Sequence, residues 1–396
     1  MQDKHKQICS YIEGIAPELL DLSDAIFDNP ELGLQEHFAS GKLCDYLEKT
    51  GFAVERGVAD IETAFRATWE NGTGGPSIGL LCEYDALEGI GHACGHHTQG
   101  PCILAAAAAL KQFAGDTPFK VVVYGTPAEE TCASKVAMLE RGCFQDIDVA
   151  LMMHLGPDTC VDKHSRALDE FEVEFRGKSA HAAITPELGR SAFDAVILTF
   201  NGVEFLREHV RDDVRIHYTV LDAGGPANVV PAYAKAYFEL RSFDGNYLKG
   251  VVERFERIVQ GAAMMTDTAA ELKNLVHMES KIPVYSLNDL LIEKAKLVNA
   301  PGIKPPREST GSTDFGNVMS RMPGSCIRMK FVPSGTAAHS QEYINAGKSK
   351  EAHEAIIQGA EILTLASMDM IEDPALFQKI QEEFRQNRAE ALKSAQ

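Results

Sequence analysis

Three imidazoles and a thiol stand together in the segment His92-Ala93-Cys94-Gly95-His96-His97. Imidazole and thiolate are the side chains that bind borderline-soft cations such as Zn²⁺. Cys94 and His96 are two positions apart, so both side chains can point to the same side of an extended or tightly turned segment. A buried cysteine with polar loop histidines is the ordinary interpretation of any one of these residues. A metal site is therefore favoured only if other ligand-type residues join the cluster.

Two adjacent carboxylates, Glu129 and Glu130, follow the apolar segment 121–124 and the turn residues Gly125 and Pro127. Consecutive β-forming residues before Gly and Pro predict a buried strand that ends in a loop. Alone, such a pair is usually a solvated corner. Beside a metal cluster, one carboxylate can bind the metal while the other acts as general base for a metal-activated water.

His154 repeats this arrangement, because it follows the apolar segment 148–153 and precedes Gly156-Pro157. Predicted strands ending near residues 82, 124 and 153 each lead into polar, ligand-type side chains. In α/β sheets, sites gather outside the carboxyl ends of the strands. The pattern therefore predicts that these groups converge.

The elements that would position them fall into two patterns. Residues 1 to about 167 alternate between helical and strand patterns, with helices expected near 4–27, 35–50 and 97–113 and a strand at 77–82. From Leu168 the pattern changes, because Phe171–Phe175 alternates with the period of a sheet that has one wet face. A helix near 190–209, strands at 214–221 and 234–240 and a helix near 246–264 complete the β-α-β-β-α-β order of a ferredoxin-like arrangement.

The first pattern returns at about residue 284 and includes a long helix near 349–369. We therefore expect residues 1–167 and 284–396 to form a metal-binding catalytic domain. Residues 168–283 would form an inserted domain.

Composition narrows the class of protein. A chain of 396 residues with 45% hydrophobic and 24% charged residues is typical of a globular protein with more than one domain. The net charge of −19 argues against nucleic acid and anionic membranes as partners. The nine cysteines have no framework spacing, and residues 1–30 resemble no secretory signal, so reduced thiols and a cytoplasmic location are expected.

The ordered motifs resemble the M20 family of metallopeptidases and amidohydrolases. The resemblance is greatest to the aminoacylase-like branch, which contains auxin-conjugate, N-acyl amino acid and aminobenzoyl-glutamate hydrolases, and it extends to the M20 dipeptidases. The motifs that carry it are Asn29–Gly33, Cys94-Gly95-His96, Pro127–Glu130, His154, Gly177–Ala182, Asn228–Pro231, Arg241, Gly311–Gly316 and Ala338-His339-Ser340. Because they follow one another in the family's order, they are specific together although each is weak alone.

The resemblance implies an α/β fold in which a mixed-sheet, zinc-peptidase-like catalytic domain carries an inserted ferredoxin-like α+β lid or dimerisation domain. It also implies two divalent metal ions per subunit (Zn, Mn or Co) and assigns Glu129 as the general base. The ligands that it implies are Cys94, His96, Glu130, His154 and His339.

Several residues near the implied ligands differ from the family's usual residue types. His97 lies where close relatives have Asp or Asn, and we expect it to orient a ligand from behind, although an extra metal contact or a solvent-facing position is an alternative. Glu83 and Asp85 lie where the wider family has His-x-Asp. Asp85 is expected to orient a ligand, Glu83 to be structural, and His92 has no assigned role.

Three residues of the inserted domain bear on the substrate. His181 resembles the histidine that reaches a neighbouring subunit's active site and polarises the scissile carbonyl. Asn228 and Arg241 resemble the pair that binds a substrate carboxylate. The resemblance thus implies a small-molecule substrate with a free carboxylate and a homodimer, or a higher oligomer, formed through the lid.

The expected function is hydrolysis of the amide bond of an N-acyl amino acid, a dipeptide or an aminobenzoyl-glutamate-like substrate. Two alternatives fit the same residues. One is an aminohydrolase that releases ammonia at the same dinuclear site. The other is an inactive, metal-retaining binding protein, against which the presence of Glu129 argues.

Overall fold

The chain is described by a computed structural model that covers residues 2–308 and 310–393. Its internal contacts divide it into two compact units. The first is formed by residues within 1–164 and 281–390, and the second by residues 165–280 together with 391–393. The two boundaries of the insertion lie a few residues before those expected, and residues 391–393, which were expected in the first unit, group with the second.

The first unit is built on a mixed sheet whose strand order, among the described residues, is β1-β2-β4-β3-β5-β11-β6. Neighbours β4, β3, β5 and β11 run parallel, whereas β1, β2 and β6 pair antiparallel at the two sides. The strands are β1 (Ala53–Arg56), β2 (Phe65–Asn71), β3 (Ser77–Cys82), β4 (Phe119–Gly125), β5 (Val149–Gly156), β6 (Cys160–Val161) and β11 (Gly324–Lys330).

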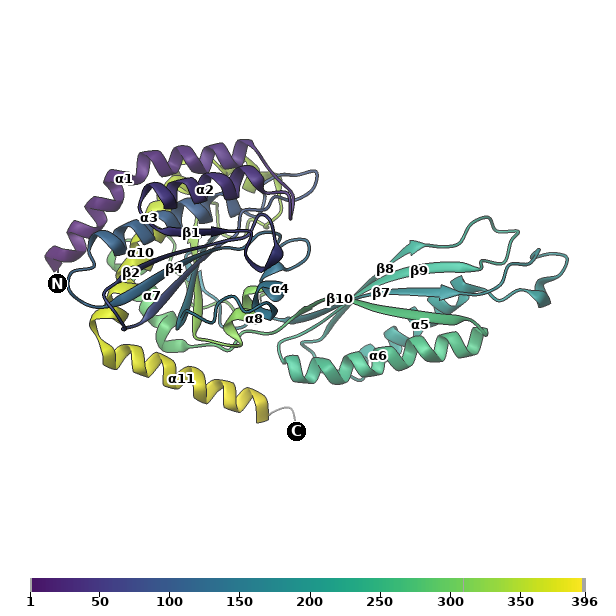
Figure 1. Cartoon of the computed structure of the whole chain (residues 1–396). Coiled ribbons are helices and arrows are strands. Elements are labelled where there is room, and N and C mark those ends of the chain that lie inside the picture. The colour runs from purple at the N-terminus through teal and green to yellow at the C-terminus, as the bar shows by residue number, and fades with distance from the viewer. Residues whose placement is uncertain (1, 309, 394–396) are drawn as a thin grey trace. The chain divides into compact units, whose positions relative to one another are not determined.

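The parallel strands are mostly apolar, as is usual for strands covered on both faces of a sheet, although they also carry polar residues such as Lys120, His154 and Arg328. Successive side chains of a strand point to opposite faces. On one face, Val121 and Val123 of β4 pack with buried residues of α1 (Gln2–Asp28), α3 (Gln99–Gln112) and α10 (Lys350–Glu372). On the other, Val122 and Tyr124 pack with residues of α4 (Ser134–Glu140) and α8 (Phe315–Met319). Figure 1 shows α1, α3 and α10 together along one side of this sheet.

The remaining helices of this unit are α2 (His37–Lys49), α7 (Tyr285–Leu297), α9 (Gln341–Ala346) and α11 (Pro374–Lys393), with 3₁₀ turns at Val58–Asp60 and His96–Thr98. The expected helices near 4–27, 35–50, 97–113 and 349–369 thus correspond to α1, α2, α3 and α10. Strands β1 and β2 had no sequence prediction, because their short segments mix apolar and charged residues.

The second unit has the order β7-α5-β8-β9-α6-β10 and an antiparallel sheet of order β10-β7-β9-β8. This is the predicted ferredoxin-like arrangement. Its elements are β7 (Ala167–Arg176), a 3₁₀ turn at Pro186–Leu188, α5 (Ala192–Arg207), β8 (Arg215–Asp222), β9 (Tyr233–Ser242), α6 (Gly245–Thr266) and β10 (Ala269–Met278). Alternate residues of β7 and β9, such as Phe171, Val173 and Phe238, form one core with the buried faces of α5 and α6.

Side-chain caps begin both helices of this unit. Ser191 Oγ accepts the backbone N–H of Asp194 at the start of α5, and Asp244 Oδ1 accepts two N–H groups at the start of α6. These bonds satisfy donors that a helix leaves unpaired in its first turn. Within the described chain, we find no helix with the length and apolar character needed to cross a bilayer.

Candidate metal centre

The parallel strands of the first unit place the predicted ligands at one edge of the sheet. Because β3, β4, β5 and β11 are parallel neighbours, their carboxyl ends lie side by side. Glu83 follows β3, Glu129 and Glu130 follow β4, and His339 lies in the loop after β11. His154 differs from the expectation, because β5 continues to Gly156 and the histidine lies inside the strand.

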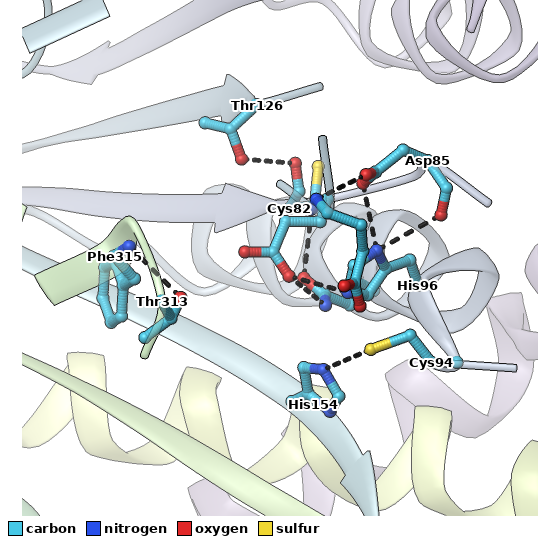
Figure 2. Close-up of polar contacts among 12 residues, drawn as sticks. Cys82, Asp85, Cys94, His96, Thr126, His154, Thr313 and Phe315 are labelled. Atoms are coloured by element: carbon cyan, nitrogen blue, oxygen red, sulfur yellow. Dashed lines mark hydrogen bonds and ion pairs between the residues drawn. The ribbon is translucent and has the colours of Figure 1, made fainter. Parts of the chain in front are cut away.

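Cys94 and His96 flank Gly95, whose backbone has a φ of 91°. A side chain at this position would be strained, and its Cβ would meet the side chain of Leu155 at about 3.0 Å. The turn brings Cys94 Sγ to 3.4 Å from His154 Nε2 (Figure 2). Cys94, His96 and His154 form one group whose ligand-type atoms all lie within 4.8 Å of one another.

His96 is fully buried and held from one side by Asp85. Its Nδ1 lies 3.0 Å from Asp85 Oδ1, a contact drawn as a dashed line in Figure 2. The other carboxylate oxygen of Asp85 accepts the backbone N–H of Glu130 at 2.9 Å. Asp85 therefore contacts a candidate ligand and the loop that carries another, which is the arrangement expected of a residue that orients ligands.

Glu130 and His339 complete the cluster. His339 Nε2 lies 3.1 Å from Glu130 Oε1, and Cys94, Glu130 and His339 form a second group within 4.8 Å. Burial raises the pKa of Glu130, but the hydrogen bond from His339 together with the charge of His96 and the contact with Cys94 outweighs it, and the pKa falls to about 2. The carboxylate is thus held ionised, as a metal ligand must be.

The donor set fits divalent cations. His96 Nε2 is buried and makes no hydrogen bond within the described structure, although Glu83 Oε2 lies 3.2 Å from it. A buried imidazole nitrogen without a hydrogen-bond partner is costly unless a ligand satisfies it. Burial also raises the pKa of the Cys94 thiol to about 12. A thiolate at this place therefore needs a nearby positive charge, which a metal ion would supply.

Glu129 lies beside this donor set. His96, Glu129 and Glu130 form a further group within 4.8 Å. Burial, followed by the negative charges of Glu83, Asp314 and Glu130, raises the pKa of the Glu129 carboxyl well above its usual range. A raised pKa brings a carboxylate closer to the range in which general bases work.

Sequence reasoning missed a buried ion cluster at the edge of the site. Lys135 Nζ lies 2.6 Å from Glu83 Oε1 and 2.7 Å from Asp314 Oδ1, and all three side chains are inaccessible or nearly so. Glu83 and Asp314 belong to motifs that the sequence analysis singled out, but nothing in the spacing of Lys135 marks it as part of the site. Its place depends on β3, α4 and α8 meeting in the fold.

His97 has other neighbours than the expected ones. Its Nε2 lies 2.8 Å from the carbonyl oxygen of Gly347, and its ring packs edge-on against Phe27. His92 lies next to it, with ring centroids 5.3 Å apart. None of these three contacts of His97 involves a predicted ligand. They give no support to the expectation that His97 orients a metal ligand. Its ring instead packs against Phe27 of α1.

The three predicted substrate residues lie in the second unit. His181 and Asn228 belong to two paired loop segments, since His181 bridges to Val229 and the N–H of Ala182 donates to Asn228 O. Both side chains are exposed. Arg241 lies near the opposite end of β9, where its guanidinium contacts Glu239 Oε2 at 2.7 Å.

The known proteins that this chain resembles point to a single family. The profile of peptidase family M20/M25/M40 matches residues 79–369. The chain is 32% identical to the Xaa-Arg dipeptidase of Mus musculus, over 94% of this chain and 90% of that protein. It is 29% identical to one of the subunits of the p-aminobenzoyl-glutamate hydrolase of Escherichia coli (strain K12), over 98% and 96% respectively.

Among solved structures, a dinuclear metal-binding M20 peptidase of Bacillus subtilis aligns with a TM-score of 0.64 at 21% identity. The alignment covers 88% of this chain and 98% of that one. The family match, the 32% identity over nearly the whole chain and the shared fold lead to one conclusion: the chain belongs to peptidase family M20/M25/M40 and is a metal-dependent hydrolase of amide bonds.

Proposed function

We propose that this enzyme hydrolyses the amide bond of a small N-acyl amino acid, dipeptide or aminobenzoyl-glutamate-like substrate that carries a free carboxylate. The observation that carries the proposal is the convergence of thiol, imidazole and carboxylate ligand atoms around the half-buried carboxyl of Glu129. The dipeptidase and hydrolase names of the relatives support the same substrate class.

Two divalent ions, Zn²⁺, Mn²⁺ or Co²⁺, would be held by the five candidate ligands Cys94, His96, Glu130, His154 and His339. Bound cations of this kind polarise a carbonyl oxygen and make water more acidic. Two neighbouring cations would repel each other, and the negative charge of the Cys94 thiolate and of the Glu130 carboxylate would offset that repulsion.

Glu129 would carry the proton. Its carboxylate accepts a proton from the attacking water and later delivers it to the leaving nitrogen as the C–N bond breaks. The products are a carboxylic acid and an amine, and no proton is gained or lost by Glu129 over the cycle. The raised pKa of Glu129 favours this role, because a carboxyl with a raised pKa returns easily to its neutral form.

The lid residues would act across a dimer. Strand β9 pairs regularly with β7 from Tyr233 to Ser242, so its ends are on the order of 30 Å apart at 3.3 Å per residue. Asn228 precedes one end, and Arg241 is at the other. Within one chain the two could not share a single carboxylate, whereas Arg241 of one chain and Asn228 of a second could. His181 neighbours Asn228 and would accompany it.

Exposed apolar residues of the second unit support such an assembly. Strand β8 is at the edge of its sheet and exposes Val220 and Leu221, while α5 exposes Ile197 and Phe205. An unprotected edge strand is a template for pairing with another chain. A twofold dimer through this unit would cover both.

Metal content per chain, measured with turnover of N-acyl amino acids, dipeptides and aminobenzoyl-glutamate after addition of Mn²⁺, Zn²⁺ or Co²⁺, tests the proposal. We expect two metals per chain and products that are an acid and an amine. Release of free ammonia would favour the aminohydrolase instead. Stoichiometric metal without hydrolysis of any amide would favour the binding protein.

A further inference from the structure

Lys135 is a fully buried ammonium that joins two carboxylates from distant parts of the chain. Its Nζ lies 2.6 Å from Glu83 Oε1 and 2.7 Å from Asp314 Oδ1. The backbone N–H of Lys135 also donates to Asp314 Oδ2 at 3.0 Å. Each oxygen of Asp314 is therefore occupied by Lys135, and the three residues form one buried unit.

Three carboxyl groups crowd together beside this ammonium. One carboxylate oxygen from each of Glu83, Glu129 and Asp314 lies within 4.8 Å of the others. Lys135 contacts two of the three, Glu83 and Asp314. Buried carboxylates without a counter-charge repel one another and move apart or take up protons. The position of each carboxylate in the group thus depends on the ammonium.

The cluster also anchors the loop that carries the proposed base. At the start of this loop, Thr126 Oγ1 donates to the Cys82 carbonyl at 3.0 Å. At its end, Lys135 lies in the first turn of α4 and binds Glu83, the residue after Cys82. Glu129 lies between the two anchors. Both ends of the loop are therefore tied to the carboxyl end of β3.

Glu83 in turn lies against a candidate ligand. Gln99 Nε2 donates to Glu83 Oε2 at 2.8 Å, and the same oxygen lies 3.2 Å from His96 Nε2. Lys135 holds the other oxygen. Because both oxygens have defined partners, the plane of the Glu83 carboxylate beside His96 is set by Lys135 together with Gln99.

We propose that Lys135 is a positioning residue for amide hydrolysis, whose ammonium holds Glu83 against His96 and fixes the loop of Glu129 by clamping Glu83 to Asp314. This inference rests on the proposed function. It differs from a packing role in one respect, because an apolar side chain of the same length would fill the space without holding either carboxylate. Ordinary core packing would not require the charge.

The test compares Lys135→Ala with Lys135→Met in the holoenzyme. Metal affinity is measured by chelator competition, and kcat and KM are measured for the substrate found in the turnover screen. In both variants we expect kcat and metal affinity to fall by about 10- to 100-fold, which is the usual effect of removing a residue that orients metal ligands. KM should change little.

Chemical rescue separates charge from packing. n-Propylammonium replaces the atoms that Lys135→Ala removes, so it should restore much of the lost metal affinity and kcat in that variant. 1-Propanol, a neutral molecule of similar shape, should not. Lys135→Met fills the space and should not respond to either. Lys350→Met, at an exposed lysine that pairs with Glu354, is the matched control and should behave as wild type.

Equal metal affinity and kcat in Lys135→Met and wild type would overturn the proposal, as would equal rescue by propanol and propylammonium. If Lys135→Met fails to fold, the double variant Lys135→Met, Asp314→Asn takes its place. It removes one buried charge of each sign, so the Asp314 carboxylate is not left without its partner. A folded double variant that stays slow supports positioning, and one with full kcat contradicts it. If the wild type hydrolyses no amide, the proposed function fails, while the metal affinities still decide the role of Lys135.

Discussion

The two units hold their predicted functional residues in different ways. In the first unit, the predicted ligands converge from neighbouring parallel strands and the loops after them, and their ligand atoms lie within 4.8 Å in overlapping groups. In the second unit, His181 and Asn228 are exposed on paired loops, and Arg241 lies at the other end of β9. The predicted metal ligands are thus close together within the first unit, whereas the predicted substrate residues are not all close together within the second.

The difference reflects how each fold presents side chains. Parallel strands direct their carboxyl ends to one edge, so a site there needs no other chain. An antiparallel sheet has its loops at both ends, and residues at opposite ends cannot meet within it. We therefore expect metal binding to be a property of one unit and substrate binding to depend on assembly. The following predictions test that contrast, from the largest expected effect to the smallest.

His96→Ala should remove both metal and activity. The side chain lies in two of the ligand groups and is fully buried, so its loss leaves Asp85 and Glu83 without their shared partner. Metal analysis after gel filtration, together with an amide hydrolysis assay, measures both effects. A variant with full metal content and full turnover would disprove the assignment of the ligand cluster.

Glu129→Gln should keep both metals and lose turnover by about 10²- to 10⁴-fold, the usual contribution of a general base. The amide is close in size and cannot accept the proton. Metal content and kcat are compared with those of wild type. Loss of metal in this variant would mean that Glu129 is a ligand and that Glu130 is the base.

Mixed variants test whether the chain forms the proposed dimer and whether His181 acts across it. His181→Ala and His96→Ala should each be inactive, but after subunit exchange a 1:1 mixture should regain about a quarter of wild-type activity, because half the dimers contain one intact site. Activity is followed during exchange under mild denaturant. A mixture that stays inactive while heterodimers form would place His181 in its own subunit's site or outside any site.

Arg241→Ala should raise KM far more than it lowers kcat. The expected loss of binding free energy is roughly 1.5–3 kcal/mol, the contribution of a hydrogen bond to a charged group. Asn228→Ala should act in the same direction and less strongly. Arg241→Lys is the control, because it keeps the charge and loses the fork that matches a carboxylate. If substrates with and without the free carboxylate are affected equally, neither residue binds it.

His97→Ala should have the smallest catalytic effect. Its hydrogen-bond contact is with the Gly347 carbonyl and its ring packs on Phe27, so we expect a loss of about 1–3 kcal/mol in the free energy of unfolding with metal retained. Denaturant unfolding and metal analysis measure the two quantities. Metal loss without loss of stability would restore the role first expected for this residue.

Much of the fold could be predicted from the sequence, because the spacing of its apolar and polar residues is regular. The alternation in β7 and the order of elements predicted the ferredoxin-like unit, and apolar segments before turns predicted β3, β4 and β5. Strands β1 and β2 were not predicted, since short strands beside a parallel core need not be apolar. His154 was placed after its strand rather than within it, because side-chain chemistry does not mark where hydrogen bonding ends.

The sequence by itself determined the chemistry and the family. Residue types such as Cys94, His96 and Glu130 in ordered motifs define a metal-dependent hydrolase before any coordinate is known. Only the tertiary structure decided which partners they meet. Asp85 joins His96 to the Glu130 loop, and Lys135 enters a cluster that no local spacing could reveal. Such contacts join residues far apart along the chain, and they exist only once the strands are aligned and the helices packed on both faces of the sheet.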